Sequence, residues 1–291
     1  MKNLYAILAA LCLTCGGASA ATDSLKVVFW NVENFFDWKA RGTSDSETEF
    51  SSEGIRHWTR KRFYAKCNAI SKTLLMMSEE SGGAPDIIGL AEVENRFVLE
   101  QLTGATALRK LGYGIVHFDS PDHRGIDCAL LYRKSRLRPE RSSARHIYDS
   151  TGAIVSTRDI LLVEFDSLAV LVNHHPSKVG GNSERRQLAM SRMRHLQDSL
   201  APGRVLCIGD FNDDVWNSGG KGTIRYNGAW EKIDGCFSTG FRNVRETVYD
   251  SPLLCVPDRT FGGVKPRRTY NGLRYQGGIS DHYPIIVDVR W

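Results

Sequence analysis

The feature that most constrains this chain is a short, largely apolar run at residues 204–208 that stops at the sequence Gly209-Asp210-Phe211-Asn212. A run of this length next to a glycine is typical of a buried β-strand. Asp210 and Asn212 stand at positions i and i+2, so on an extended chain their side chains point the same way. This strand end therefore offers a carboxylate and an amide to a hard cation or a phosphate. Both residues are also common in turns, so a simple turn is the alternative for the motif on its own.

Polar ends of this kind recur along the chain. Each of six apolar runs meets a carboxylate, an amide or an imidazole at one end, which turn preferences alone do not explain. The residues are Asn31 and Glu33 after the first run, Glu92 after the second, Asn173 and His174 after the run from Leu168, Asp210 and Asn212, Asp234 after Ile233, and Asp281 and His282 before the last run. The polar groups of the chain thus gather where its expected strands stop.

The chemical types of these side chains indicate the kind of site. Carboxylate and amide oxygens are hard ligands that suit Mg²⁺ or Mn²⁺, with Ca²⁺ as a further option. The chain has no Cys or His pair at the spacing of a structural zinc site. It also contains neither G-x-S-x-G nor G-x-x-x-x-G-K-[ST], the signatures of serine acyl transfer and of P-loop chemistry. A site for a divalent metal and a phosphate is the interpretation that these observations favour.

In their order along the chain, these residues resemble the endonuclease/exonuclease/phosphatase superfamily. The motifs are Asn31-x-Glu33, Glu92, Asn173-His174, Gly209-Asp210-Phe211-Asn212, Ile233-Asp234 and Ser280-Asp281-His282, and the resemblance extends from Val27 to Val287. It implies an α/β (α+β) fold built as a four-layer sandwich, with two mixed β-sheets face to face and helices on the outside. It also implies hydrolysis of a phosphoester by in-line attack of water, with a divalent metal at the edge where the strand ends converge.

The resemblance further implies a role for each motif residue. Glu92 is the expected principal metal ligand, and the residues beside it are Asn31, Glu33 and Asp281. His282 would act as general base or hold the attacking water, and Asp234 would orient it.

The remaining motif residues are expected to handle the nucleophile and the phosphate. Asp210 would position the nucleophile or protonate the leaving oxygen, and Asn212 would donate to a phosphoryl oxygen. His174 would contact the phosphate opposite His282. Each of these residues, taken singly, would be interpreted as a turn or surface residue.

Candidates for substrate binding are Arg124, Asp127, Asn173, Ser177 and Lys178. Arg124 would reach phosphate as a bidentate donor, and Asp127 would orient His174, although a solvated loop pair explains both equally well. Ser177 and Lys178, with Arg158, are expected at the rim. His175 would point to the opposite strand face from His174 and have a structural or rim position.

Periodicity predicts an alternation of strands and helices within one domain, residues 21–291. The expected strands are 25–30, 86–91, 113–118, 128–132, 160–165, 168–173, 204–209, 233–237 and 283–289. The expected helices are 59–77, a second between Glu92 and Gly112, and a third from Asn182 or Ser183 to Leu200. Residues 39–58 and 243–275 are expected to be mainly loop.

The first 20 residues have the pattern of a signal peptide: Lys2, the apolar stretch Leu4–Leu13 and the small-residue site Ala18-Ser19-Ala20. The sequence therefore predicts an exported protein, with lipid attachment at Cys15 disfavoured because Thr14 precedes it. Five cysteines would follow the cleavage site, and Cys236 and Cys255 are the only pair in loop-like surroundings, which leaves a disulfide between them open. No run is long enough for a membrane span.

The net charge of +5 gives a mild preference for anionic partners, without the basic blocks of a dedicated nucleic-acid binder. We expect a monomeric phosphodiesterase that acts on nucleic acid or a nucleotide. The alternatives are a phosphomonoesterase or a hydrolase of a phosphorylated lipid or inositol, and, more remotely, a non-catalytic binding module. Tryptophans in or beside expected loops could stack on bases: Trp38, Trp58, Trp216 and Trp230.

Overall fold

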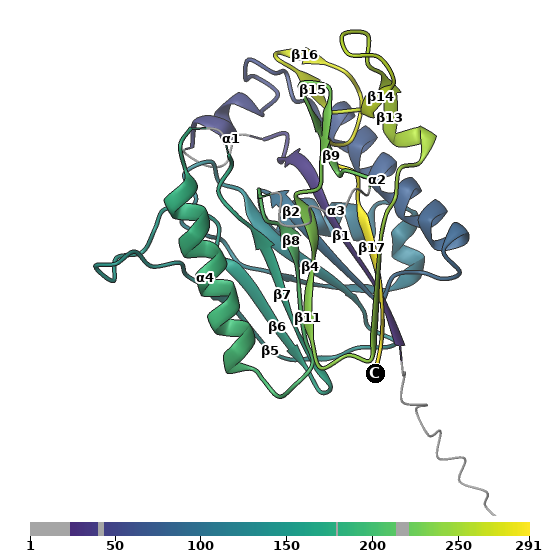
Figure 1. Cartoon of the computed structure of the whole chain (residues 1–291). Coiled ribbons are helices and arrows are strands. Elements are labelled where there is room, and N and C mark those ends of the chain that lie inside the picture. The colour runs from purple at the N-terminus through teal and green to yellow at the C-terminus, as the bar shows by residue number, and fades with distance from the viewer. Residues whose placement is uncertain (1–23, 40–43, 179, 214–220) are drawn as a thin grey trace, which may run out of the picture.

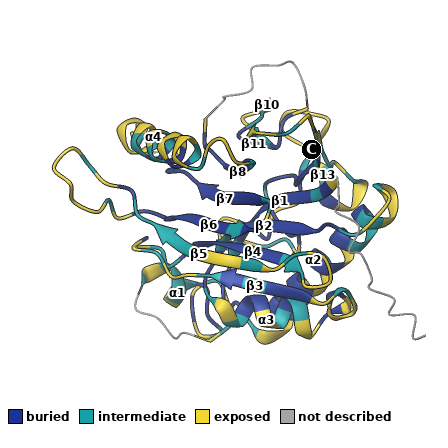
Figure 2. Ribbon diagram, turned by 90° about the horizontal axis from the view of Figure 1, so that it is seen from below, coloured by how far each residue is buried: buried dark blue, intermediate teal, exposed yellow. Residues whose placement is uncertain are grey.

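The computed structural model describes residues 24–39, 44–178, 180–213 and 221–291. The expected signal peptide, residues 1–20, lies outside these ranges, as does Trp216, so export stays a prediction. Two mixed β-sheets pack face to face, with α4 (Ser183–Ser199) on one outer face and α2 (Arg60–Glu80) and α3 (Arg96–Gly104) on the other (Figures 1 and 2). The expected four-layer sandwich is confirmed.

The first sheet has six strands in the order β12-β17-β1-β2-β4-β3. Their bounds are β12 (Asn243–Val248), β17 (Ile285–Arg290), β1 (Ser24–Phe35), β2 (Ile87–Val93), β4 (Asp127–Arg133) and β3 (Tyr113–His117). β1 and β2 are parallel, and the other neighbours are antiparallel. The parallel pair places the ends of β1 and β2, which carry Asn31 and Glu92, side by side.

The second sheet has five strands in the order β11-β8-β7-β6-β5. Their bounds are β11 (Asp234–Thr239), β8 (Val205–Asp210), β7 (Leu168–His174), β6 (Ile160–Phe165) and β5 (Pro139–Arg145). β7 and β8 are parallel, with His174 opposite Asp210, and β11 runs antiparallel to β8, with Asp234 opposite the same Asp210. Three predicted polar strand ends therefore become direct neighbours.

Side-chain alternation along β1 explains how the layers are held together. Val27 and Phe29 point to the space between the sheets, while Val28 and Trp30 point to the layer of α2 and α3. A third apolar cluster joins β7 and β8 to α4 through Leu171, Cys207, Phe211, Met193 and Leu196. Both faces of each sheet are thus buried over much of their area, which explains the continuous apolar runs in the sequence.

The helices lie close to their expected positions. The Thr59 side chain caps α2 by accepting from the Arg62 N–H. The expected helix after Glu92 is two pieces, α3 and the 3-10 turn η1 (Ala107–Leu111), and the second ends at Gly112, whose φ is +65°. A further helix, α1 (Asp45–Glu49), lies within the expected loop 39–58 and has a capping box formed by Ser44 and Glu47.

Residues 243–275 are more ordered than expected. They contain β12, the 3-10 turn η2 (Pro252–Leu254), and two small hairpins, β13 (Cys255–Pro257) with β14 (Val264–Pro266) and β15 (Tyr270–Asn271) with β16 (Arg274–Tyr275). A third hairpin, β9 (Ile224–Tyr226) with β10 (Ala229–Glu231), lies against them at the upper end of the molecule in Figure 1. Cys236 and Cys255, like the other described cysteines, are free thiols. Among the described residues, no helix is long and apolar enough to cross a membrane.

Candidate active site

The polar strand ends meet around Asp210, at the end of β8. Its Oδ2 accepts a hydrogen bond from Asn31 Nδ2 of β1 at 3.0 Å, which links the two sheets at this edge. Its Oδ1 accepts from the backbone N–H of Asn212 at 3.0 Å. Asp210 and Asn31 are both almost fully buried. Asp210 is therefore fixed from both sides, as a group that positions a reactant must be.

Two imidazoles approach Asp210. His174 Nε2 lies 3.7 Å from Asp210 Oδ2, and His282 Nε2 lies 3.8 Å from the same oxygen. The other ring nitrogen of His282, Nδ1, is 2.8 Å from Asp234 Oδ2. The backbone of His282 is held as well, because its carbonyl accepts from Trp30 Nε1 at 3.0 Å and its N–H donates to Ser280 Oγ at 2.9 Å. His282 and Asp234 thus form a buried pair with Nε2 directed at the centre of the site.

The surrounding charges move the pKa values of these groups in different directions. Burial lowers the pKa of His282, but the carboxylates of Asp234 and Asp210 outweigh it and hold that pKa well above its usual value. His174 has a pKa well below its usual value because it is buried and faces the cations Arg158 and Arg124. Burial and the nearby Asp234 carboxylate raise the pKa of Asp210 to about 7. Opposed shifts in one cluster are a feature of sites that move protons.

A second group of acids lies beside this cluster. Glu92 Oε2 accepts from the backbone N–H of Asn34 at 2.7 Å, and its Oε1 lies 3.9 Å from His174 Nε2. Glu33 accepts from Arg268 Nε at 3.1 Å and from the Thr269 N–H at 2.7 Å. Arg268 also donates to Asp281 at 2.8 Å, so its guanidinium bridges two of the acids. Burial, followed by the Asp281 charge, raises the pKa of Glu33 to about 7.

Sequence reasoning missed two cations that face these acids, Lys66 and Arg268. Lys66 is buried; its Nζ donates to the Glu33 carbonyl and, at 2.7 Å, to Thr269 Oγ1. The burial of Lys66 could have been predicted from the sequence, because Lys66 lies three residues after Phe63 and beside Cys67 on the inward-facing stripe of α2. Arg268 had no such signal, because it lies in the segment that was expected to be loop.

Backbone conformation marks the same edge. Glu33, Asn34, Glu92 and Asn212 have φ values of +47°, +50°, +62° and +49°, in the left-handed region that non-glycine residues rarely adopt. Glu33, Asn34 and Glu92 lie near the ends of β1 and β2, where the strand pairing is irregular, and Asn212 follows the end of β8. Such strain persists where surrounding contacts determine the conformation, which is a recurrent property of functional sites.

The donor set fits a divalent cation with hard-ligand preferences. The oxygens of Glu92 and Asp281 suit Mg²⁺ or Mn²⁺, whereas both Glu33 oxygens already accept protein hydrogen bonds. Asp210, Asp234 and His282 also bring one ligand atom each to within 4.8 Å of the others. Within the described ranges, buried Asp234 Oδ1 and His174 Nδ1 have no hydrogen-bond partner, so the site has unused polar capacity.

The substrate candidates divide into two groups. Arg124 lies at the site: one guanidinium nitrogen, Nη2, is 2.9 Å from Asn34 Oδ1 and 3.6 Å from Glu92 Oε2. Asp127 does not orient His174, because its carboxylate lies 3.2 Å from His117 Nε2 and accepts from the Ser120 N–H at 2.8 Å. The expected contact fails because Asp127 begins β4, in the other sheet from His174.

The other three candidates lie along β7 and just beyond it. Asn173 is fully buried, and its Nδ2 donates to the carbonyls of Leu171 and Ile208, so it braces the strand ends. Ser177 and Lys178 are exposed at the rim, where Lys178 pairs with Glu231 at 2.6 Å. Arg158, expected at the rim, is buried and donates to the His175 carbonyl at 2.6 Å.

Comparisons with solved structures agree with this fold. The chain is similar to an endonuclease/exonuclease/phosphatase family protein from Bacteroides thetaiotaomicron, at 15% identity and a TM-score of 0.57, over 91% of this chain and 97% of that one. It is similar to the human Nocturnin catalytic domain with bound sulfate, at 17% identity and a TM-score of 0.54, over 92% and 94%. It is also similar to D. rerio TDP2 complexed with a single-strand DNA product, at 16% identity and a TM-score of 0.54, over 92% and 99%.

Sequence comparison identifies a family for this chain but no individual relative. A search of curated proteins found no match. The model of the Endonuclease/Exonuclease/phosphatase family matches residues 26–235, which include Asn31, Glu92, His174, Asp210 and Asp234 but not Asp281 and His282. Together with the fold and the buried Asp and His cluster, this match shows that the chain belongs to the endonuclease/exonuclease/phosphatase family.

Proposed function

We propose that this protein is a divalent-metal-dependent phosphodiesterase that cleaves nucleic acid by in-line attack of water. The observation that carries the proposal is the arrangement of two imidazoles about one carboxylate, with the Nε2 atoms of His174 and His282 at 3.7 and 3.8 Å from Asp210 Oδ2. In-line displacement at phosphorus needs groups that address the attacking oxygen and the phosphoryl oxygens at the same time. This cluster supplies both kinds.

The chain's own residues divide the work as follows. Asp234 fixes the direction of His282 and stabilises its charged form, so that Nε2 faces the reacting group. Asp210, held by Asn31 and the Asn212 N–H, positions the attacking water and receives or returns a proton at Oδ2.

The phosphoryl oxygens need donors and positive charge. His174 and Asn212 lie next to Asp210 and could donate to these oxygens, with one Nδ2 hydrogen of Asn212 already given to the His175 carbonyl. When bound by Glu92 and Asp281, with Asn31 beside them, Mg²⁺ or Mn²⁺ would supply positive charge to these oxygens. Arg268 and Arg124 add fixed charge, since each contacts one of the acids.

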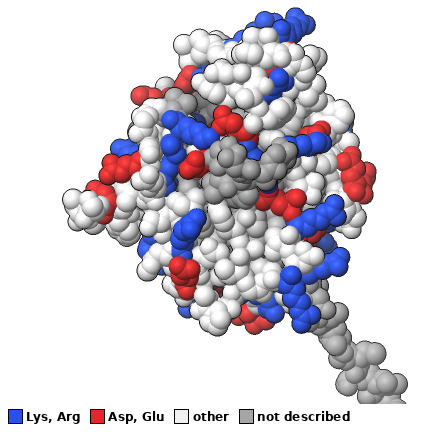
Figure 3. Space-filling model, viewed as in Figure 1, with Lys and Arg blue, Asp and Glu red and all other residues white. Residues whose placement is uncertain are grey.

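A cavity beside the reaction centre supports a polyanionic substrate. It has a volume of about 390 Å³, and Asp281 and Arg268 form one wall. Arg267, Lys265 and Tyr226 also line it. Figure 3 shows lysine and arginine side chains next to acidic ones around the middle of this face. Lysine and arginine side chains next to a reaction centre can bind the phosphate backbone of a nucleic acid.

Exposed aromatic rings near this cavity suit nucleic acid in particular. Tyr226 is 59% exposed and Phe261, in the neighbouring β13–β14 hairpin, is 54% exposed. Exposed rings among cations form platforms on which bases stack. Of the tryptophans expected to stack on bases, Trp58 is buried and cannot do so, whereas Trp38 is half-buried and packs against Phe63. Trp230 is partly exposed but stacks on Tyr283.

A substrate panel tests the proposal. Plasmid DNA, RNA, bis-p-nitrophenyl phosphate and p-nitrophenyl phosphate are each incubated with Mg²⁺, Mn²⁺, Ca²⁺ or EDTA. We expect metal-dependent cleavage of the nucleic acids and the diester, and its loss in Asp210→Ala and His282→Ala. Asp166→Ala, an exposed carboxylate in the turn between β6 and β7, is the matched control. Preferential hydrolysis of the monoester would replace the proposal with a phosphomonoesterase.

A further inference from the structure

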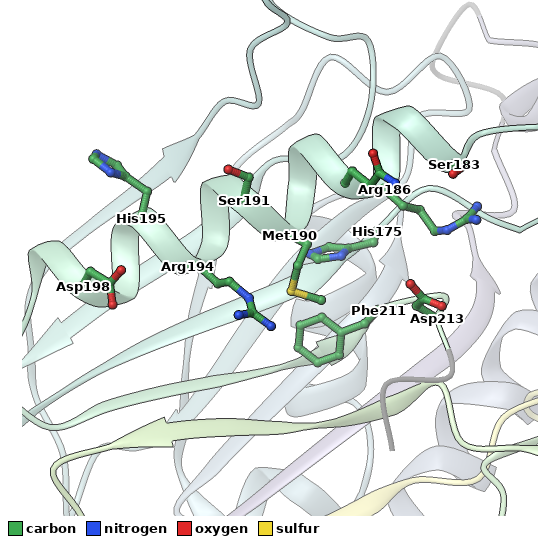
Figure 4. A pocket seen from close by; sticks show the side chains of 11 residues that line it. His175, Ser183, Arg186, Met190, Ser191, Arg194, His195, Asp198, Phe211 and Asp213 are labelled. Atoms are coloured by element: carbon green, nitrogen blue, oxygen red, sulfur yellow. The ribbon is translucent and has the colours of Figure 1, made fainter. Parts of the chain in front are cut away.

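A second cavity lies on the opposite side of the strand ends from the reaction centre. It has a volume of about 530 Å³ and lies between α4 and the end of β8 (Figure 4). His174 and His175 are consecutive, so their side chains leave β7 on opposite faces. His174 faces Asp210, whereas His175 lines this cavity. The proposed chemistry makes no use of the cavity.

One long face of α4 forms a wall of the cavity. The residues of that face are Ser183, Arg186, Gln187, Met190, Ser191, Arg194 and Asp198, which recur at helical spacing. Figure 4 shows the side chains of Met190 and Arg194 directed from the helix towards the Phe211 ring. The cavity therefore combines an apolar floor with polar walls, and its volume is typical of a small-molecule site.

His175 is the anomaly in this cavity. It is only 1% exposed, and neither of its ring nitrogens has a hydrogen-bond partner among the residues that the structure describes. Its ring meets Phe211 edge to face, with centroids 5.0 Å apart. A neutral imidazole carries one donor and one acceptor, and buried polar groups are nearly always satisfied. A ligand with a donor or an acceptor at its edge, as a nucleobase has, would meet one of these two requirements.

Two arginines give the cavity its positive charge. Arg186 donates through Nη1 to the Ser177 carbonyl at 3.0 Å, and its other guanidinium nitrogens could donate to a ligand at the cavity. Arg194 is exposed, and its guanidinium carbon lies 6.0 Å from the centroid of the Phe237 ring. Arginine guanidinium groups suit phosphate because they donate in a planar fork.

We propose that this cavity is a nucleotide subsite, which takes one nucleotide unit of the substrate strand away from the bond that is cleaved. The base would lie against Met190 and Phe211 with its edge on His175, and the phosphate would lie on Arg186 and Arg194. This inference rests on the proposed function in taking the substrate to be nucleic acid.

The backbone connects the subsite to the reaction centre. The His175 N–H donates to the Asp210 carbonyl at 2.8 Å, and the His175 carbonyl accepts from Asn212 Nδ2 at 3.0 Å. Asp213, next to Asn212, also lines the cavity. An occupant of the subsite therefore lies against the segment that carries Asp210 and Asn212, so the two sites are adjacent along the path of one strand.

The test measures binding of a short, fluorescein-labelled single-stranded oligodeoxynucleotide in EDTA, where no metal-dependent cleavage occurs. The double variant Arg186→Met/Arg194→Met should raise Kd about tenfold or more, because both arginine contacts to the phosphate of the subsite are lost. The slope of log Kd against log salt should fall by roughly 0.7, the value for one phosphate of a single strand. Arg185→Met, an exposed arginine of the same helix outside the cavity, is the matched control.

His175→Phe tests the base contact, because it keeps an aromatic ring and removes both nitrogens. We expect about a threefold to tenfold rise in Kd with an unchanged salt slope. If this buried variant does not fold, the surface arginine variants carry the test alone. A Kd that the double variant changes no more than Arg185→Met does would overturn the subsite.

A competition assay distinguishes a subsite for a nucleotide within a strand from a site for a free nucleotide. Unlabelled 5′-dAMP should displace the oligonucleotide from the subsite in the wild type and lose this effect in the double variant. Binding of 5′-dAMP without competition would indicate a site for a free nucleotide and would overturn the proposal. Since binding needs no turnover, inactivity on every phosphodiester would refute the proposed function without altering these results. Conversely, active enzyme with unchanged oligonucleotide binding in the double variant would refute the subsite alone.

Discussion

The two sides of the β7 and β8 ends differ sharply although consecutive residues form them. On one side His174 faces Asp210, with Asp234 and His282 beyond it, in a cluster where most polar groups are paired. On the other side His175 faces Phe211 and α4, and within the described part of the chain both of its ring nitrogens are unpaired. The neighbouring strand makes the difference, because alternation on β8 sends Asp210 to one face and Phe211 to the other.

This contrast shows that the chemistry of a side chain depends on which residues of the neighbouring strand lie opposite it. Burial lowers the pKa of all three histidines of the region, and only His282, which faces carboxylates, ends with a raised pKa. Two consecutive histidines in a sequence therefore do not reveal whether either of them will face carboxylates in the fold. Substitutions on each side can test whether the two sides function as separately as their contacts indicate.

The largest expected effect concerns the carboxylate that both imidazoles approach. Asp210→Ala should lower kcat on bis-p-nitrophenyl phosphate by about 10³-fold to 10⁴-fold, because it removes the group that positions water and the partner of Asn31. Steady-state kinetics with saturating Mg²⁺ measure the loss. Activity within tenfold of the wild type would place the reaction centre elsewhere.

The two histidines should differ in the same assay. His174→Gln should lower kcat by about 10²-fold, as expected for the loss of a donor to the phosphoryl group. His175→Gln should lower it by less than about fivefold, since its ring points away from Asp210 and its backbone contacts are kept. Equal losses in the two variants would show that the two sides act as one site.

The pH dependence of stability should identify His175 as buried and neutral. Burial, with the nearby cations Arg158 and Arg186, lowers its pKa to about 3. An unfolded histidine titrates near 6.5, so below that pH the unfolded chain binds a proton that the folded chain does not. The free energy of unfolding therefore falls with decreasing pH, by roughly 2 to 3 kcal/mol at pH 4.5 from this residue.

His175→Phe removes this contribution. Urea denaturation at pH 7 and pH 4.5 should show a smaller acid loss in the variant than in the wild type, by that amount. Asp213, which also lines the cavity, is unchanged in both proteins and cancels in the comparison. The same acid loss in both proteins would mean that His175 gains a partner or becomes hydrated at low pH.

Most of the fold could be predicted because its strands are buried on both faces. Runs such as Ile87–Leu90 and Val205–Ile208 are continuously apolar and stand out in the sequence. β12 and β5 could not be predicted in this way, because they are edge strands whose exposed positions are polar. Their partners β17 and β6 are separated from them in the sequence by residues 249–284 and 146–159, and composition does not encode these pairings.

The site was predictable to the extent that it consists of strand ends. Asp210, Asp234, His174 and His282 lie together because parallel and antiparallel neighbours bring strand ends to one edge. Arg268 was not predictable, because its position between Glu33 and Asp281 depends on small hairpins without periodic signal. Asp127 was assigned to the wrong histidine for a related reason: the sequence shows that it follows a loop but not which sheet it joins.

The smallest expected effect is at the rim that separates the two sides. Lys178 is exposed and pairs with Glu231 at 2.6 Å, and such surface pairs contribute about 0 to 1 kcal/mol. Lys178→Ala should raise KM for a single-stranded oligonucleotide less than about threefold and leave kcat and stability unchanged, because one mobile phosphate contact is lost. Measurements at low and high salt check this, since the difference should shrink as salt increases. A tenfold change in KM would instead mean that the strand crosses the rim at Lys178 between the reaction centre and the cavity beneath α4, and the two sides would then form one continuous binding path.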